Sequence, residues 1–354
     1  MRATVAIFSV VDIVNTEFPA PLGWQSGHLQ TVRSRIVRRK YDLSQLSDQR
    51  SESVVLDDGS GDRLVVQIQQ NIEPRNEGIV LLVHGLGGSA ESDYVCATAR
   101  ALLQAGFHVA RIDLRGAGLS WNTCKQLYHA GRTADLRTVI KHLAAQPEAK
   151  QDNEPLVFVM GFSLGGNATI KLVGEPLQGA PVAAAVAVSA PLDLVVGSEH
   201  LRQVAFGTYD KYLLAGLRRQ VLQPGPDGQP RVTEFERDAV RRSKSIEDFD
   251  DAITSRRNGW RDAREYYEVN SSGQFLPKVA VPLLVIHSVD DPMIPAAPYE
   301  AVDWAALART TPVRHAVTPL GGHVGFHEKG HKLPWYARVA ARFFVKQADR
   351  VGAS

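Results

Sequence analysis

The chain has 354 residues, of which 44% are hydrophobic and 22% are charged, and its formal net charge is +2. This length allows a sizeable core plus an accessory element, and the composition is that of an ordinary globular protein. The near-neutral charge gives no support for nucleic-acid binding, and the two cysteines argue against a disulfide framework and fit a reducing compartment. We expect a cytoplasmic monomer without a nucleic-acid partner.

The first fifty residues, 1–50, are predicted to form an irregular lead-in that packs on the core. Proline and glycine near its start disfavour regular structure. An apolar run from Ala3 to Val14 is broken by Asp12 and is too short to cross a bilayer, and no convincing cleavage site follows it. At most, this run would make peripheral contact with a membrane surface.

From residue 51 onward, short apolar runs alternate with amphipathic segments. The runs predict buried strands, and apolar residues recurring every three or four positions predict helices. This alternation indicates parallel βαβ units, and so an α/β fold with a mostly parallel central sheet and helices on both faces. The expected strands are Ser53–Leu56, Arg63–Gln69, Gly78–Val83, Phe107–Leu114, Leu156–Met160, Val182–Val188, Val279–His287 and Val313–Val317, and the expected helices include Tyr94–Gln104, Thr133–Leu143 and Trp335–Val345.

The pattern changes near Pro191. Residues 192–261 are rich in charge and loosely helical, with a proline- and glycine-rich stretch in the middle. We interpret them as a helical cap inserted into the core rather than as an independent second core. The core would then consist of residues 51–191 and 262–354.

The stretch from Pro155 to Gly174 is typical of a strand, a tight turn and a helix, with Ser163 inside the turn Gly161–Gly165. A serine at this point must adopt a strained backbone angle that pushes its hydroxyl outward. Side chains at positions 161 and 165 would collide with the neighbouring strand and helix. The helix N-terminus favours developing negative charge. Ser163 is therefore a candidate nucleophile, although an ordinary serine in a glycine-rich turn is the alternative.

A nucleophilic serine needs a base, and the base needs an acid that holds its tautomer. Asp290 and Asp291 follow one predicted strand, and His323 follows the last one, in a loop that Gly321–Gly322 are expected to make flexible. Such residues collect at the carboxyl ends of the strands of a doubly wound sheet. We prefer Asp291 as the acid because Pro292 fixes the backbone after it, and Asp290 would cap the turn.

Stabilisation of an oxyanion requires two preorganised amide donors. Leu164 supplies the amide directly after the candidate nucleophile. The other is expected from the loop His84–Gly88, which follows the predicted central strand, with Leu86 as the first choice. The alternative for this loop is a plain glycine turn that opens a helix.

Two other patterns resemble cofactor or metal sites. The segment Gly85–Ala90, with Asp113 ending the next strand, mimics a dinucleotide fingerprint, but a dehydrogenase would leave the three triad candidates unexplained. His323, His327 and His331 have helical spacing for metal ligands, but the glycines between them interrupt a helix. We expect neither a cofactor nor a metal.

Seven segments together resemble the YheT-type branch of the α/β hydrolases, whose animal relatives are the ABHD1/ABHD3-type lipid hydrolases. The resemblance implies an α/β-hydrolase fold and esterase or lipase-like activity on short- to medium-chain fatty-acyl esters. It also places nucleophile, acid and base at Ser163, Asp291 and His323. The segments are GHLQT (27–31), HGLGGS (84–89), RGAG (115–118), YHAGRTADLR (128–137), GFSLGGN (161–167), DDP (290–292) and GGHVGF (321–326).

These observations lead us to expect a serine carboxylic-ester hydrolase that works through an acyl-enzyme. Its partner would be a small-molecule fatty-acyl ester, such as an acylglycerol or a phospholipid. Acyl transfer to an alcohol is an alternative that uses the same residues. A non-catalytic binding protein with the same fold is another, and the complete set of triad candidates argues against it.

Overall fold

The computed structural model describes residues 18–37, 39–75, 78–151 and 154–352, so the apolar run Ala3–Val14 lies outside the described residues. A sheet of eight strands in the order β1-β2-β4-β3-β7-β8-β9-β10 forms its centre. Neighbours from β4 to β10 are parallel, and β2 pairs antiparallel with both β1 and β4. The strands are β1 (Ser47–Val55), β2 (Arg63–Asn71), β3 (Ile79–Val83), β4 (His108–Asp113), β7 (Val157–Phe162), β8 (Val182–Val188), β9 (Leu283–Ser288) and β10 (Val313–Thr318), and β5 (Lys150–Gln151) pairs with β6 (Glu154–Pro155) outside this sheet.

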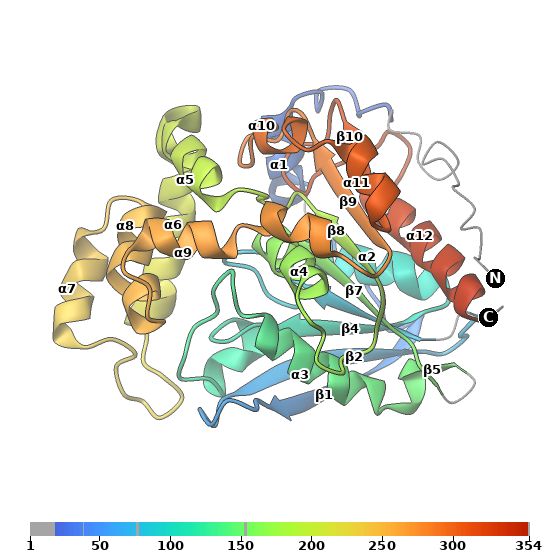
Figure 1. Ribbon diagram of the computed structural model, residues 1–354, viewed down its shortest axis with the longest axis horizontal. Helices are drawn as coiled ribbons and strands as arrows, with labels where there is room; N and C mark the ends of the chain where they lie inside the picture. The colour runs from blue at the N-terminus through green and yellow to red at the C-terminus, as the bar shows by residue number, and fades with distance from the viewer. Residues whose placement is uncertain (1–17, 38, 76–77, 152–153, 353–354) are drawn as a thin grey trace.

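Helices cover both faces of the sheet (Figure 1). The described helices are α1 (Gly27–Ile36), α2 (Asp93–Gln104), α3 (Thr133–Ala144), α4 (Leu164–Gly174), α5 (Leu194–Gln203), α6 (Thr208–Leu222), α7 (Glu234–Arg242), α8 (Ile246–Phe249), α9 (Ala263–Asn270), α10 (Ala297–Glu300), α11 (Trp304–Thr310) and α12 (Trp335–Gly352). Within the described ranges, no helix combines the length and the hydropathy that a membrane span requires.

The continuous apolar runs arise because each central strand is buried on both sides. In β3, Ile79, Leu81 and Val83 face one core, which α3, α4, α10 and α11 cover. Val80 and Leu82 face the other core, which α2 and α12 cover. The predicted α/β class, with a mostly parallel sheet between two layers of helices, is therefore confirmed.

Helices α5 to α9 lie between β8 and β9 in the sequence and gather on one side of the sheet, at the left of Figure 1. They have a small core of their own, which includes Leu214, Leu217, Val240 and Phe249. A second cluster, made by Ala130, Leu194, Ala263, Tyr266 and Tyr267, joins them to the sheet domain. We call α5 to α9 the cap, which includes α9 (Ala263–Asn270) although the predicted boundary of 261 places that helix in the core. The residue boundaries of the cap and the core stay a prediction.

The expectation of an irregular N-terminal lead-in is wrong for part of its length. Helix α1 occupies Gly27–Ile36, where Ser26 accepts a hydrogen bond from the Leu29 amide as an N-cap. Strand β1 begins at Ser47 rather than Ser53, because it pairs along its whole length with β2. Both differences place more of this segment in regular structure.

Candidate active site

Ser163 lies in a sharp turn between β7 and α4, with φ of 53° and ψ of −120°. A Cβ on Gly161 would lie 2.1 Å from the Gly165 carbonyl oxygen, and a Cβ on Gly165 would lie 2.4 Å from the His84 carbonyl oxygen. Only glycine avoids these collisions, which confirms the physical reason given for the two glycines. The strained turn presents the serine hydroxyl at the carboxyl end of the sheet.

The structure brings the three predicted triad residues together. His323 Nε2 lies 3.0 Å from Ser163 Oγ, and His323 Nδ1 lies 2.9 Å from Asp291 Oδ2. They come from the loops after β7, β9 and β10, so the parallel sheet places them at one edge. The Met293 and Ile294 amides donate to Asp291 Oδ1 at 2.8 and 3.0 Å.

Asp291 remains ionised despite its burial. Burial alone would raise the pKa of its carboxyl, but the neighbouring His323, the hydrogen bond between them and the Ile294 amide hold that pKa below its ordinary value. His287 Nδ1 lies 4.0 Å from Asp291 Oδ2, yet burial lowers the His287 pKa to about 4. His287 is therefore neutral at pH 7 and does not balance the Asp291 charge.

The sequence predicted that Asp290 caps its own turn, but its side chain binds a different loop. Its Oδ1 accepts a hydrogen bond of 2.9 Å from the Gly322 amide. This bond ties the loop after β9 to the loop that carries His323. Between the two neighbouring aspartates, the one that contacts the histidine ring is Asp291.

Helix α1 supports the histidine loop from outside the sheet. Thr31 Oγ1 accepts a hydrogen bond of 2.8 Å from the His323 amide, and Gln30 Oε1 accepts one of 2.7 Å from the His327 amide. A Cβ on Gly322 would lie 2.3 Å from the Gly27 carbonyl oxygen. Glycine in this loop thus permits close packing on α1, which corrects the expectation that it provides flexibility.

The loop after β3 is held so that one of its amides is left available. The Gly85 amide donates to the Tyr94 hydroxyl at 3.0 Å, and the Gly87 amide donates to the Tyr128 hydroxyl at 2.7 Å. Between them, the Leu86 amide makes no hydrogen bond to any described residue. A Cβ on Gly85 would lie 2.9 Å from the Ser163 Cβ, so this loop lies directly against the serine.

Leu164 supplies the second predicted amide. It is the first residue of α4, where a backbone N–H has no acceptor within the helix. Both amides are predictions from the sequence, and their role stays a prediction. The sequence analysis missed Tyr94 and Tyr128, which position the loop. Tyr128 begins the YHAGRTADLR segment, and this segment was the sequence signal that could have identified it.

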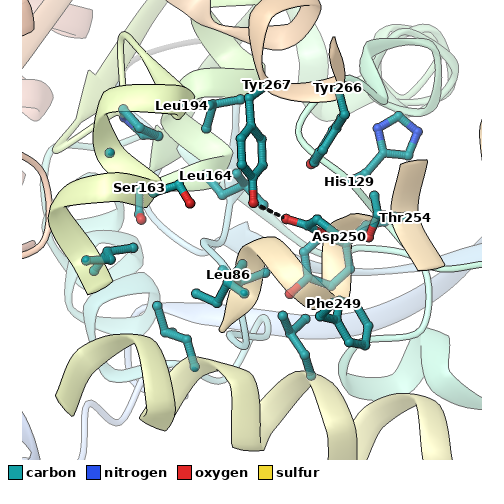
Figure 2. A pocket seen from close by; sticks show the side chains of 18 of the residues that line it. Leu86, His129, Ser163, Leu164, Leu194, Phe249, Asp250, Thr254, Tyr266 and Tyr267 are labelled. Carbon is teal, nitrogen blue, oxygen red and sulfur yellow. Dashed lines mark hydrogen bonds between the residues drawn. The ribbon is translucent and has the colours of Figure 1, made fainter. Parts of the chain in front are cut away.

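Ser163 lies where two cavities meet. The first extends into the cap and has a mostly aliphatic and aromatic lining (Figure 2). The second lies on the side of His323 and α1. The two cavities share four lining residues: Leu86, Ser163, Leu213 and Met293.

The alternative cofactor readings find no support in the geometry. Asp113 is 1% exposed, and its two carboxylate oxygens accept hydrogen bonds from the Ala90 and Leu119 amides at 2.7 and 2.9 Å. It is thus unable to reach a ribose. The segment from His323 to His331 forms turns rather than a helix. Across the described ranges no group of side chains has the composition of a metal site.

A family model described as alpha/beta hydrolase fold matches residues 78–330. The chain belongs to this family. Its relatives include YheT of Escherichia coli (strain K12), which is 30% identical over 88% of this chain and 87% of its own length. This α/β hydrolase therefore has the YheT-type resemblance expected from its sequence.

Two eukaryotic relatives are longer than this hydrolase. A Picea glauca protein, "Embryogenesis-associated protein EMB8", is 30% identical over 72% of the chain, and the "Monoacylglycerol lipase" of Saccharomyces cerevisiae is 26% identical over 77% of it. The hydrolase spans only 54% and 60% of these two relatives. Among solved structures, the Pyrococcus furiosus esterase Pf2001 has the same fold, with a TM-score of 0.53 and 16% identity over 89% of this chain and 93% of that one.

Proposed function

We propose that this protein is a serine hydrolase of carboxylic esters, with Ser163 as nucleophile, His323 as base and Asp291 as acid. The observation that carries the proposal is the chain of two hydrogen bonds, 3.0 and 2.9 Å long, that links the three side chains beside an apolar cavity. The names of relatives such as the yeast monoacylglycerol lipase support an ester as the substrate.

In the proposed reaction, His323 Nε2 takes the Ser163 proton while Oγ attacks the ester carbonyl carbon. The Leu86 and Leu164 amides donate to the oxyanion of the tetrahedral intermediate. The ester C–O bond then breaks, and His323 gives its proton to the departing alcohol. Asp291 holds the imidazole tautomer and balances the imidazolium charge.

A water molecule completes the cycle. His323 takes one of its protons, the hydroxide attacks the acyl-enzyme, and the carboxylic acid leaves as Ser163 recovers its proton. The apolar cavity that extends into the cap suits the acyl chain, and the cavity beside His323 suits the alcohol. We infer that the acyl chain is of short to medium length, as in an acylglycerol or a phospholipid.

Covalent labelling tests this proposal. We expect a fluorophosphonate probe to modify the wild-type protein and p-nitrophenyl esters to be hydrolysed. Ser163→Ala should abolish labelling and lower kcat by about 10⁶-fold, as loss of a triad nucleophile does elsewhere, with an unchanged melting temperature. Labelling that survives Ser163→Ala would refute the assignment. A wild-type protein that binds esters without turnover would instead be a binding protein.

Acyl transfer to an alcohol is a second candidate because the cavity beside His323 has room for an alcohol as well as for water. Adding ethanol to a turnover assay separates the two reactions. Ethyl ester that exceeds free acid at modest ethanol concentrations would identify a transferase. We expect free acid to dominate.

A further inference from the structure

The cap cavity has a mostly apolar lining that also includes a carboxylate. Asp250 lines this cavity and is only 9% exposed (Figure 2). The Tyr267 hydroxyl donates to its Oδ2 at 2.7 Å, and the Thr254 hydroxyl donates to its Oδ1 at 2.6 Å. A carboxylate offers about four acceptor positions, so two hydrogen bonds leave capacity for a ligand.

No cation neutralises this carboxylate in the described part of the chain. Asp250 makes no salt bridge there. The next residue, Asp251, forms one at the surface, where its Oδ2 lies 3.8 Å from Arg256 Nη2. Glu247 and Asp210, whose charges act on the Asp250 carboxyl, have the same sign as Asp250. Burial raises the Asp250 pKa to about 6, the two hydroxyls oppose this rise, and Glu247 and Asp210 add to it. The side chain is still mostly ionised at pH 7.

The local backbone is also unusual. Asp250 begins a π-helical segment, η5 (Asp250–Ser255), directly after α8. Such wide turns are rare and occur frequently at functional sites. A buried charge on an irregular turn costs stability, which natural proteins tolerate mainly where function requires it.

A second polar group faces the same cavity. Ser198 lines the cavity and lies beside Tyr267. Its buried hydroxyl oxygen has no hydrogen-bond partner at normal distance and angle among the described residues. A hydroxyl group both donates and accepts hydrogen bonds, so Asp250 and Ser198 each offer a partner to a ligand hydroxyl in this cavity. An alkyl chain end would satisfy neither and would displace the water that solvates the carboxylate.

We propose that the cap cavity selects acyl chains that carry a hydroxyl group, with Asp250 accepting the hydrogen bond of that hydroxyl. This proposal rests on the proposed ester hydrolysis and names its substrate class. An ammonium group would also donate to Asp250. It would lose more hydration than a hydroxyl on passing the leucine side chains near Ser163, so we assign the hydroxyl.

The test compares p-nitrophenyl decanoate with decanoates that carry one hydroxyl at successive carbons of the outer half of the chain, where lactones do not form readily. We expect at least one hydroxylated ester to exceed the plain ester by about 10-fold in kcat/KM, because a bond to an ionised acceptor is a strong one. Asp250→Leu should reverse this ratio. Asp251→Asn, a change of the same charge at the neighbouring position, should leave it unchanged.

Three results would overturn the proposal. They are equal kcat/KM for the plain and hydroxylated esters, an unchanged ratio in Asp250→Leu, or a preference for a chain that ends in an ammonium group. If Asp250→Leu does not fold, Ser198→Ala replaces it and should reduce the preference. Hydrolysis of all esters without preference would reject only this proposal, whereas no hydrolysis of any ester would reject the proposed function itself.

Discussion

The two neighbouring aspartates after β9 differ in what they bind. Asp291 contacts the His323 ring, and Asp290 contacts the Gly322 amide. Replacing either carboxylate by an amide conserves size but changes what the oxygen atoms do. At Asp291 the amide would hold the wrong histidine tautomer, whereas at Asp290 an amide oxygen still accepts from a backbone N–H.

We therefore expect Asp291→Asn to lower kcat by about 10⁴-fold, as in other serine triads. Asp290→Asn is the matched control and should lower kcat by less than about 10-fold. Steady-state kinetics on one p-nitrophenyl ester measures both. The reverse order of effects would assign the acid to Asp290.

Tyr94 and Tyr128 fix the amides on either side of Leu86. In the proposed mechanism they would therefore act on the oxyanion indirectly. Tyr128→Phe should lower kcat by about 10-fold, the value of one hydrogen bond, with little change in KM. Tyr299→Phe is a control, since its hydroxyl donates to the Ala190 carbonyl outside this loop. It should reduce the melting temperature similarly without the selective loss of kcat. Equal kinetic effects in both variants would show a merely structural role.

At the scale of elements, α1 links three parts of the molecule. It supports the histidine loop through Thr31, and it reaches the cap through His28, whose Nδ1 lies 2.8 Å from the Tyr209 hydroxyl. It also packs closely on the loop after β9, because a Cβ on Gly27 would lie 1.7 Å from the Asp290 carbonyl oxygen. The position of α1 should therefore control the position of His323.

Gly27→Ala tests this dependence. The new methyl group must push α1 away from Asp290, so we expect at least a 10-fold loss of kcat/KM together with a lower melting temperature. Gly216→Ala in α6 adds a methyl group where no atom lies within 4 Å. That control should gain about 0.5–1 kcal/mol of stability and keep full activity. Unchanged activity in Gly27→Ala would show that α1 does not position the base.

The elements that the sequence predicted well are those whose signal is local. Buried strands such as Ile79–Val83 show as apolar runs, and the serine turn shows as two glycines four residues apart. Helix α1 was missed because Pro19, Pro21 and Gly23 dominate the segment before it, although Ser26 is an N-cap signal. Local patterns therefore predicted the fold and the three triad candidates.

Contacts between distant segments could not be predicted in the same way. Thr31 meets His323, and Tyr128 meets Gly87, only after the sheet has assembled. Asp250 is similar, since nothing near it in the sequence marks it as facing a cavity rather than solvent. The charge-rich character of the cap hides the burial of this carboxylate.

At the scale of the whole molecule, Arg115 links segments that lie far apart in the sequence. It is 1% exposed and binds Asp135 on α3 at 2.6 Å, together with Asp58 and Asp62 in the β1–β2 connection, at 2.6 and 3.0 Å. The RGAG and YHAGRTADLR segments therefore meet in one buried ion cluster. Burial would raise the Asp58 pKa, but Ser60 and Arg115 lower it to about 2.

Arg115→Met should lower the free energy of unfolding by about 3–5 kcal/mol, because it leaves buried carboxylates without a cation. Arg264→Met removes an exposed pair with Glu268 and should cost less than about 0.5 kcal/mol. Urea unfolding measures both.

A carboxyl with a lowered folded pKa stabilises the protein above its unfolded pKa, and this contribution is lost as the pH falls through the folded value. The loss of unfolding free energy that Arg115→Met causes should therefore become smaller as the pH falls from 3.8 to about 2. A loss that does not change with pH would contradict this account.

The meeting of two cavities at Ser163 has a consequence for the order in which products leave. On the proposed mechanism, the alcohol departs past His323 while the acyl chain is still attached within the cap. The free acid is then the last product, and it rebinds the same empty enzyme that the ester binds. Accumulating fatty acid should act as a competitive inhibitor, whereas the alcohol, which meets the acyl-enzyme, should give mixed inhibition.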